Sequence, residues 1–353
     1  MSSIRFDPSH GPDIINYYYT NYSSCPKATS YFATWQFLST FCHSVLIVQV
    51  PLAVLTGYCI LQKTPKIMGS LKWAMLYVHA WTFNIDIAMC SLLTPYFFFP
   101  AMAFFTVGIF RVLEVPSSVQ FYIFNISIGF LFNAISALFE NRSSSFKMNR
   151  FRFEKNSTRF AFFFANGCVT ALCLLPFFWF IPEQNAAKLG VLKLIPCPTE
   201  EFFTSPAFVF TVDLASIYYF MTILTIQWLL TTAVILFFIL CTAYHIFYAE
   251  NTEYSEKTRN HQKMFFLGNM TQICIPCTFL ATPSSVVIPL QFFGIYNQVL
   301  VNCLVAFISL HGIATMLAIL LVHRPYREFI RDFCRRNFGR TLISSGHSSF
   351  VIT

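Results

Sequence analysis

Three histidines and one aspartate, all in otherwise uncharged apolar stretches, are the residues best suited to catalysis. His43, His79, His311 and Asp86 supply the ligands and the water-activating acid that a zinc hydrolase needs at one common depth. At about 1.5 Å per helical residue, His79 lies about 10 Å and His311 about 18 Å from the nearest charged loop, while His43 lies in the opposite half of its helix. Because these depths disagree, the sequence predicts no enzyme, no catalytic residue, no metal site and no cofactor.

Asp86 is the one formal charge between Trp73 and Phe110. Counted from Lys72, it lies roughly 20 Å along a helix, near the middle of a bilayer, and His79 lies two turns before it on the same face. A carboxylate at this depth is costly unless it is paired or solvated by an interior cavity. Two interpretations remain: a sodium or water site that couples a ligand pocket to the inner face, or a neutral, hydrogen-bonded Asp86 that only fastens helices together.

Most of the twelve cysteines lie inside apolar blocks, where a thiol behaves as a small hydrophobic group. Cys274 and Cys277 have the spacing of a redox or zinc motif, but they lie in an uncharged helix without a second pair, so no metal is predicted there. Cys25, Cys197 and Cys334 alone fall in aqueous segments.

The composition is that of an integral membrane protein. Of 353 residues, 56% are hydrophobic and 11% are charged, which is too little charge to cover a soluble globule of this size. The net charge of +8 does not indicate nucleic acid, because the basic residues fall in short runs between apolar blocks rather than on one solvated face. Basic cytoplasmic loops explain them better.

The stretch from Val115 to Phe139 fixes the orientation of the chain. It contains no Asp, Glu, Lys or Arg and is long enough to cross a hydrocarbon layer of about 30 Å. Glu140, Asn141, Arg142 and a mainly basic loop follow directly, so this end is predicted to face the cytoplasm. Counted outward from here, 18 of the 23 Lys and Arg residues fall in segments predicted to lie inside.

The predicted fold is an all-α membrane protein, a bundle of seven transmembrane helices with an extracellular amino terminus and a cytoplasmic carboxyl terminus. Residues 1–34 form the extracellular segment, 35–323 the bundle, and 324–353 a cytoplasmic helix and tail. The predicted spans are about 35–61, 73–95, 115–139, 160–181, 216–245, 264–288 and 297–322.

A short amphipathic eighth helix is predicted after the seventh span. Pro325 can open a new helix, on which Phe329, Phe333 and Cys334 share one face with two further apolar residues. The helix is expected to lie flat on the inner leaflet, with its arginines against anionic lipid headgroups. Cys334 is a candidate for palmitoylation, with an unmodified buried thiol as the alternative.

Several short strings, in the expected order and loops, resemble the nematode serpentine receptors of class H, over about Cys25 to Asp332. They are Ser30 to Trp35, Tyr58 to Lys66, Lys72-Trp73 with His79 and Trp81, Glu140-Asn141-Arg142, Gln272 to Pro276, Ser309 to Gly312, and His323 to Arg327. The resemblance implies a seven-transmembrane chemosensory G-protein-coupled receptor with a small-molecule ligand at the outer half of the bundle. It also implies a heterotrimeric G protein as partner and a place in the plasma membrane of sensory cilia.

The strings depart from the pattern of rhodopsin-like receptors. Glu140-Asn141-Arg142 stands where those receptors have Asp-Arg-Tyr, and Pro325-Tyr326 follows His323-Arg324 where they have Asn-Pro and a Tyr. The detailed switch cannot be carried across. The last span holds no lysine, which excludes a retinal Schiff base.

Two features are predicted for the extracellular side. Cys25 and Cys197 are expected to form a disulfide, because they are the two cysteines in segments placed outside and the usual receptor bridge has no cysteine at the start of span three. Asn21 begins a glycosylation acceptor on the correct side, whereas Asn141 and Asn156 match the pattern but face the cytoplasm. The aromatic residues near the outer end fit either an interfacial belt or an entrance for odorants.

The inner face is predicted to carry the coupling site. Arg142 is expected to reach the start of span six near Lys263 and, with Glu140, to hold this face closed, the alternative being two solvated interfacial charges. Six further residues complete the predicted switch and G-protein site, namely Asn141, Arg150, Arg152, Lys155, Pro325 and Tyr326. The basic residues could instead serve orientation alone. A transporter or channel is the alternative function, but it would line a continuous path with ionisable residues, and Asp86 is nearly alone.

Overall fold

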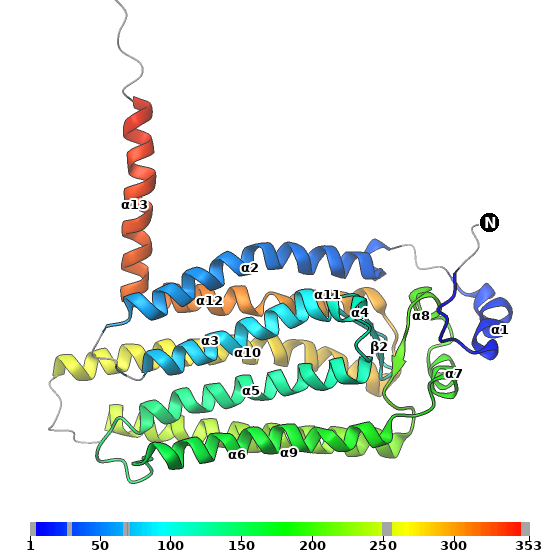
Figure 1. Ribbon diagram of the computed structural model, residues 1–353, viewed down its shortest axis with the longest axis horizontal. Helices are drawn as coiled ribbons and strands as arrows, with labels where there is room; N and C mark the ends of the chain where they lie inside the picture. The colour runs from blue at the N-terminus through cyan, green and yellow to red at the C-terminus, as the bar shows by residue number, and fades with distance from the viewer. Residues whose placement is uncertain (1–4, 27–29, 66–68, 70, 249–255, 347–353) are drawn as a thin grey trace, which may run out of the picture.

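The computed structural model describes residues 5–26, 30–65, 69, 71–248 and 256–346. Lys66 of the first predicted inner loop and residues 347–353 of the predicted tail lie outside this range. Long helices run side by side along the molecule (Figure 1). They are α2 (Trp35–Lys63), α3 (Leu71–Ile87), α5 (Ser117–Ser143), α6 (Asn156–Leu174), α9 (Leu214–Ala243), α10 (Glu256–Phe293), α11 (Gln298–Ser309) and α12 (His311–Val322).

Six helical segments of the described chain are long and apolar enough to cross a membrane. They are Trp35–Lys63, Ser117–Ser143, Asn156–Phe180, Ala215–Tyr248, Gln262–Phe293 and Gln298–Val322. The segment predicted as span two is shorter: α3 has 17 residues and continues as a π-helical turn, η4 (Ala88–Leu92). It nevertheless lies within the bundle, packed between α2 and α5.

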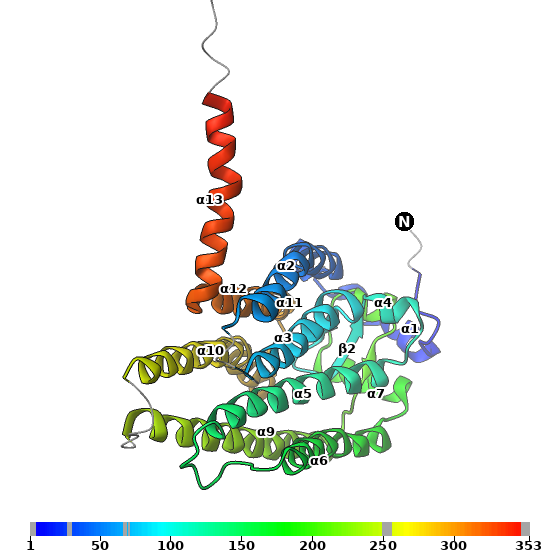
Figure 2. The same cartoon turned by 60° about the vertical axis from the view of Figure 1, so that its left-hand side comes forward.

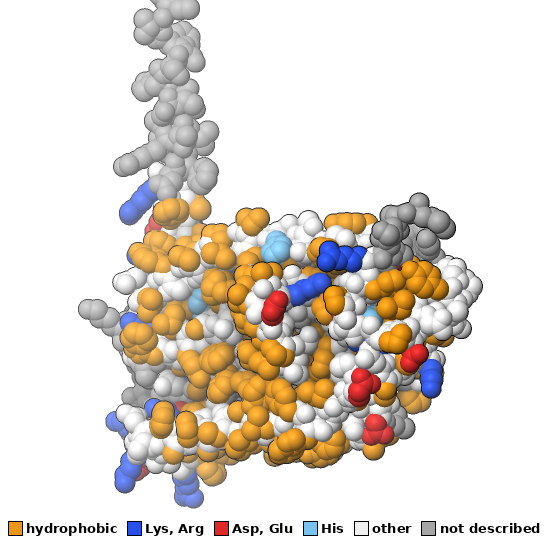
Figure 3. Space-filling model, turned by 45° about the vertical axis from the view of Figure 1, so that its right-hand side comes forward, with side chains coloured by type: hydrophobic (Ala, Val, Ile, Leu, Met, Phe, Trp, Pro, Cys, Tyr) orange, Lys and Arg blue, Asp and Glu red, His pale blue; other side chains and the backbone are white. Residues whose placement is uncertain are grey.

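Helix α5 is central to the packing, because it contacts α3, α6 and α9. On the other side, α10 packs on α11 and α12, and α12 packs on α2. Buried apolar side chains from these helices form one continuous core. Large exposed hydrophobic side chains, such as Leu229 and Leu240, lie along α9. Figure 3 shows hydrophobic side chains over the middle of the face that it draws, as expected for a surface that contacts lipid.

One end of the bundle carries a small sheet, which differs from the all-α prediction. Strands β1 (Pro95–Phe97), β2 (Ala103–Thr106) and β3 (Phe208–Val209) pair antiparallel in the order β1-β2-β3. Tyr96 pairs with Phe105, and Phe104 pairs with Phe208. The segment predicted as an aromatic outer loop forms this hairpin instead. Its β2 side chains are buried in the protein rather than placed at the membrane interface. We call this the sheet end.

Short helices cover the sheet end. They are α1 (Pro12–Thr20), α4 (Ile109–Val112), α7 (Gln184–Leu194) and α8 (Glu201–Thr204). In Figure 1, α1, α7 and α8 lie beyond the sheet, at the far right of the bundle. The amino-terminal segment and the segment between α6 and α9 therefore form one cap over this end, although they are far apart in sequence.

The last predicted spans differ from the structure in their limits. Helix α10 extends beyond 264–288, contains Pro276, Pro283 and Pro289, and ends before Gly294, whose φ of 64° suits a residue without a side chain. The predicted span 297–322 is interrupted at Leu310, between α11 and α12.

Helix α13 (Arg324–Gly346) leaves the opposite end of the bundle, which we call the α13 end. Figures 1 and 2 show that it runs crosswise to the bundle helices. Its first turns contact α2, where Phe329 lies 5.6 Å from Tyr58 between ring centroids and 4.4 Å from the Lys63 ammonium.

Candidate functional site

Glu140 lies in the last turns of α5 and is completely buried at the α13 end. Its carboxylate forms an ion pair with Arg159 of α6, with 2.7 Å between Oε2 and Nε, and accepts a hydrogen bond from the Ser144 hydroxyl. The pair therefore fastens α5 to α6 at the two ends of the loop that joins them. The sequence indicated a joint role of Glu140 with Arg142, and it gave Arg159 no role beyond its charge.

Arg142 points to a different helix. Its Nη2 donates to the Gln262 carbonyl of α10 at 3.4 Å, and its guanidinium lies 5.9 Å from the centre of the Phe265 ring. This position is next to Lys263, where the sequence placed it. Asn141, between Glu140 and Arg142, is partly buried. Helix α5 thus makes two separate contacts here: Glu140 contacts α6, and Arg142 contacts α10.

Stacked rings extend the Arg142 contact to the start of α13. Phe265 stacks on His323 at 5.0 Å, and His323 lies 5.4 Å from the Tyr326 ring. The buried Tyr326 shares a hydrogen bond with Thr64 at the end of α2, 2.5 Å between oxygens. Pro325 occupies the first turn of α13, where its missing N–H leaves no hydrogen bond broken. This network joins α5, α10, α13 and α2.

The loop between α5 and α6 is held by its own polar groups. Asn149 is buried and donates to the Ser143 carbonyl at 3.0 Å and to the Ser143 hydroxyl at 2.7 Å, while Phe153 N–H donates to the Ser144 hydroxyl. These contacts leave Arg150 and Lys155 exposed and Arg152 partly exposed. These hydrogen bonds therefore hold in place the loop backbone that carries the positive charges.

Asp86 and His311 meet in the middle of the bundle. His311 Nδ1 lies 3.3 Å from Asp86 Oδ1, and both side chains are buried. The backbone of α12 approaches at Gly312, where a Cβ would lie 1.8 Å from Asp86 Oδ2. Gly312 is thus required for the close contact of α12 with the Asp86 carboxylate. The carboxylate oxygens have no hydrogen bond from a described residue.

His79 does not join this pair, although it shares a helix with Asp86. Its Nε2 lies 3.0 Å from the Ala53 carbonyl of α2. His43 is exposed and lies 3.4 Å from the Ser39 hydroxyl. The described residues contain no group of three or more His, Cys, Asp or Glu side chains that could hold a metal ion.

Gln49 is a buried polar residue whose role the sequence did not indicate. Its Nε2 donates to the Ser309 carbonyl at 2.9 Å, at the interruption between α11 and α12. The interruption leaves carbonyls without helical partners, and Gln49 satisfies one of them from α2. The sequence signal for this role was weak, because a single amide in an uncharged helix does not indicate which group it contacts.

A disulfide joins the two parts of the cap, and polar contacts join the cap to the sheet and to the start of α2. A disulfide connects Cys25 with Cys197 of the loop after α7, with 5.6 Å between Cα atoms. The buried Tyr96 hydroxyl of β1 lies 2.9 Å from the Thr199 hydroxyl and also reaches the Ala33 carbonyl at the entrance to α2. Asn21 is exposed on this cap, and Cys334 is exposed at the other end of the molecule, on α13.

The aromatic residues that the sequence assigned to a belt or an entrance form the core of the cap. Five of them, Phe98, Phe104, Phe105, Phe202 and Phe203, are almost fully buried. Phe98 packs edge-on against Phe202, and Phe104 stacks on Phe210 of the segment after β3. The interpretation as an interfacial belt is wrong for these residues, because the sheet and α8 enclose them.

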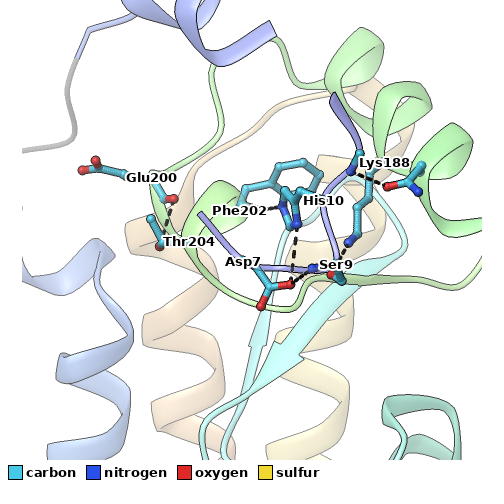
Figure 4. Close-up of polar contacts among 9 residues, drawn as sticks. Asp7, Ser9, His10, Lys188, Glu200, Phe202 and Thr204 are labelled. Atoms are coloured by element: carbon cyan, nitrogen blue, oxygen red, sulfur yellow. Dashed lines mark hydrogen bonds and ion pairs between the residues drawn. The ribbon is translucent and has the colours of Figure 1, made fainter. Parts of the chain in front are cut away.

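The segment before α1 is anchored on α7 and α8 (Figure 4). His10 Nε2 lies 2.9 Å from the Phe202 carbonyl, and its Nδ1 lies 3.7 Å from the Asp7 carboxylate. Lys188 of α7 donates to the Ser9 hydroxyl at 3.1 Å. Burial lowers the pKa of His10, and the Lys188 ammonium lowers it further. Burial also lowers the pKa of Lys188.

Comparison with known proteins identifies the architecture. The sequence model of a family described as serpentine type 7TM GPCR chemoreceptor Srh matches residues 33–336. Serpentine receptor class H-72 of Caenorhabditis elegans is 31% identical over 317 residues, which cover 90% of this chain and 91% of that protein. The family match spans the bundle, the part of the cap between α6 and α9, and the first half of α13. The chain therefore belongs to the Srh family of serpentine seven-transmembrane chemoreceptors.

Proposed function

We propose that this receptor binds a small-molecule ligand within the bundle and activates a heterotrimeric G protein at the α13 end. The observation that carries the proposal is the pair of contacts made by α5, where Glu140 holds α6 through Arg159 and Arg142 holds α10 through Gln262. A change in helix position at the ligand would separate α5 from α10 and open a surface between them. Membership of a chemoreceptor family supports the same function and does not favour a transporter or channel.

The proposed topology places the sheet end outside and the α13 end in the cytoplasm. Helix α3 with η4 supplies span two and so brings the number of spans to seven, because its 22 residues together reach roughly 30 Å and lie within the bundle. The distribution of Lys and Arg supports this orientation. In it, α13 lies along the inner leaflet, Cys334 is available for palmitoylation and Asn21 for glycosylation, and the basic residues of α13 contact anionic lipids.

The proposed coupling surface combines the loop between α5 and α6 with α13. Arg150, Arg152 and Lys155 lie on the loop, and Pro325 and Tyr326 begin α13 beside the Arg142 network. Their positive potential would steer an acidic partner surface toward the opening. The cell membrane of a ciliated sensory neuron is the proposed location, as the family membership suggests.

The test is to record G-protein activation and ion flux in the same cells that express the receptor, while volatile and water-soluble compounds are applied. We expect at least one compound to activate the G protein. Any current that this compound evokes should disappear when G proteins are inhibited. A ligand-gated current that persists when G proteins are blocked would instead indicate a channel. An Arg142→Glu variant, which loses the contact with Gln262 of α10, is expected to raise basal G-protein activation in the same cells.

A further inference from the structure

A cavity of about 170 Å³ lies at mid-depth between α5, α6 and α9. Helices α6 and α9 both pack on α5 but contact each other little, which leaves space between them. Helix α6 lies close to α5 at Gly129, because a Cβ there would lie 2.2 Å from the Thr170 methyl group of α6. The cavity is thus a consequence of helix packing and is separate from Asp86 and from the cap.

The walls of the cavity are mainly apolar and partly aromatic. Trp228 of α9 packs edge-on against Phe132 of α5, with 5.1 Å between ring centroids, and both line the cavity. Ile128 and Leu224 add aliphatic surface. A dry cavity of about 150 Å³ is large enough for benzene, so this one accommodates a single ring with a short substituent.

Two amide side chains supply polar groups to the same space. Gln227 Nε2 donates to the Thr170 hydroxyl at 2.7 Å, and Thr170 passes its own hydrogen to the Asn166 carbonyl at 3.0 Å. Asn125 Nδ2 donates to the Phe121 carbonyl at 2.9 Å. These bonds orient both amides and use a donor of each, while both amide oxygens remain as acceptors that no described residue occupies.

We propose that this cavity is a ligand site for a small aromatic alcohol, whose ring packs against Trp228 and Phe132 and whose hydroxyl donates to Gln227 Oε1. The proposal rests on the proposed receptor function and names the site and the class of its ligand. A hydrocarbon of the same shape would cover the amide oxygen of the partly buried Gln227 without giving it a donor, which is costly, so the site discriminates against such a ligand. The orientation of Gln227 by Thr170 makes Gln227 the residue that determines this specificity.

The experiment uses the full chain, purified in lipid nanodiscs, with 2-phenylethanol as the probe and ethylbenzene as its counterpart without a hydroxyl. Binding is followed by the fluorescence of the tryptophans and by the shift in melting temperature. We expect 2-phenylethanol to bind and to raise the melting temperature, and ethylbenzene to bind about tenfold more weakly, which corresponds to a loss of about 1.4 kcal/mol for the missing hydrogen bond. Equal binding of the two compounds, or no binding of either, would overturn the proposal.

Variants locate the ligand. Gln227→Leu keeps the volume and leaves Thr170 its bond to Asn166, so we expect normal folding and about a tenfold loss of 2-phenylethanol affinity with unchanged ethylbenzene affinity. Leu224→Trp fills the cavity and is expected to abolish binding. Thr225→Val and Ile226→Trp change neighbouring exposed residues of α9 outside the cavity and should bind like the parent. Parent-like binding by Gln227→Leu would refute the assigned hydrogen bond.

The outcome is separable from that of the proposed function. Direct binding in nanodiscs requires no G protein, so a probe that binds as described without activating a G protein in cells would leave the site intact and contradict the coupling. Ligands that activate the G protein through the parent could instead prove equally potent on Gln227→Leu and Leu224→Trp. That result would contradict the site and leave the proposed function standing.

Discussion

Glu140 and Arg142 lie two residues apart on α5 but stabilise different contacts. Glu140→Gln leaves the Arg159 guanidinium beside a neutral amide, and because Arg159 is 29% exposed the expected cost is about 1–3 kcal/mol, below that of a fully buried pair. We expect a lower melting temperature in nanodiscs and higher basal G-protein activity in cells, since α6 is no longer fastened to α5.

The control is Glu154→Gln. Its pair with Arg152 is long, 3.9 Å, and the Glu154 carboxylate is 77% exposed, so the change in stability should stay within about 0.5 kcal/mol. If both variants behave like the parent in melting and in basal activity, the Glu140–Arg159 pair does not hold the helices.

Gly312 permits the approach of α12 to Asp86. In Gly312→Ala the new methyl group would lie 1.8 Å from Asp86 Oδ2, so we expect a loss of about 1–3 kcal/mol or more and poor delivery to the cell surface. Gly57→Ala is the matched control, because its methyl would meet no atom nearer than 3.8 Å and alanine favours the helix by roughly 0.5–1 kcal/mol. Surface labelling and thermal unfolding measure both.

A second variant tests the cause. Adding Asp86→Ala to Gly312→Ala removes the carboxylate that the methyl group would strike, and part of the stability and surface expression should return. A double variant as defective as Gly312→Ala would mean that the glycine serves another purpose.

At the scale of elements, the cap depends on a short segment before α1 that carries His10. Burial lowers the pKa of His10 below its ordinary value of 6.5, and Lys188 acts in the same direction. The unfolded segment then binds a proton more readily than the docked one. Docking is therefore complete above about pH 6.5 and weakens as the pH falls through the lowered pKa of the docked His10. The hydrogen bond with the Phe202 carbonyl and the Asp7 carboxylate both raise the pKa of His10, but they offset this lowering only partly.

The measurement is hydrogen exchange of residues 5–14 in the nanodisc-embedded receptor between pH 7.5 and pH 5, corrected for intrinsic rates. Protection should fall with pH in the parent and stay level in His10→Gln, which keeps a hydrogen-bonding group but does not titrate. A parallel decline in both proteins would show that His10 is not the group responsible.

The sequence indicated the elements of the bundle well, because uncharged stretches and basic loops are local signals. It did not indicate the sheet, since β2 and β3 are about a hundred residues apart and their aromatic residues also fit an interfacial belt. The interruption at Leu310 was also missed, because the group that stabilises it, Gln49, lies on another helix. Charge counting found Glu140 and Arg142 but could not assign Arg159 and Gln262 as their partners.

For the whole molecule, the strongest test of coupling is to reverse charge on the loop between α5 and α6. In a variant with Arg150, Arg152 and Lys155 changed to Glu, Lys63, Lys72 and the arginines of α13 should still maintain the orientation. We expect normal surface labelling of an amino-terminal tag and G-protein activation reduced at least tenfold. The hydrogen bonds from Asn149 to Ser143 involve none of the changed side chains, so the loop should keep its shape.

A variant that reaches the surface correctly and activates the G protein as the parent does would limit these charges to setting orientation. Reversal of Lys72 to Glu serves as the control, since this residue lies on α3, outside the proposed coupling surface. An equal loss of activation there would indicate a general effect of charge.

The bridge between Cys25 and Cys197 has a consequence for how the protein is made. The two cysteines are 172 residues apart, so at about 5–20 residues per second Cys197 is synthesised roughly 10 to 35 seconds after Cys25. In the proposed orientation, α2, α3, α5 and α6 are inserted during this interval while Cys25 remains a free thiol in the secretory lumen. The amino-terminal segment must therefore wait unassembled, open to an oxidoreductase or to a wrong partner, until the second half of its own cap emerges from the ribosome.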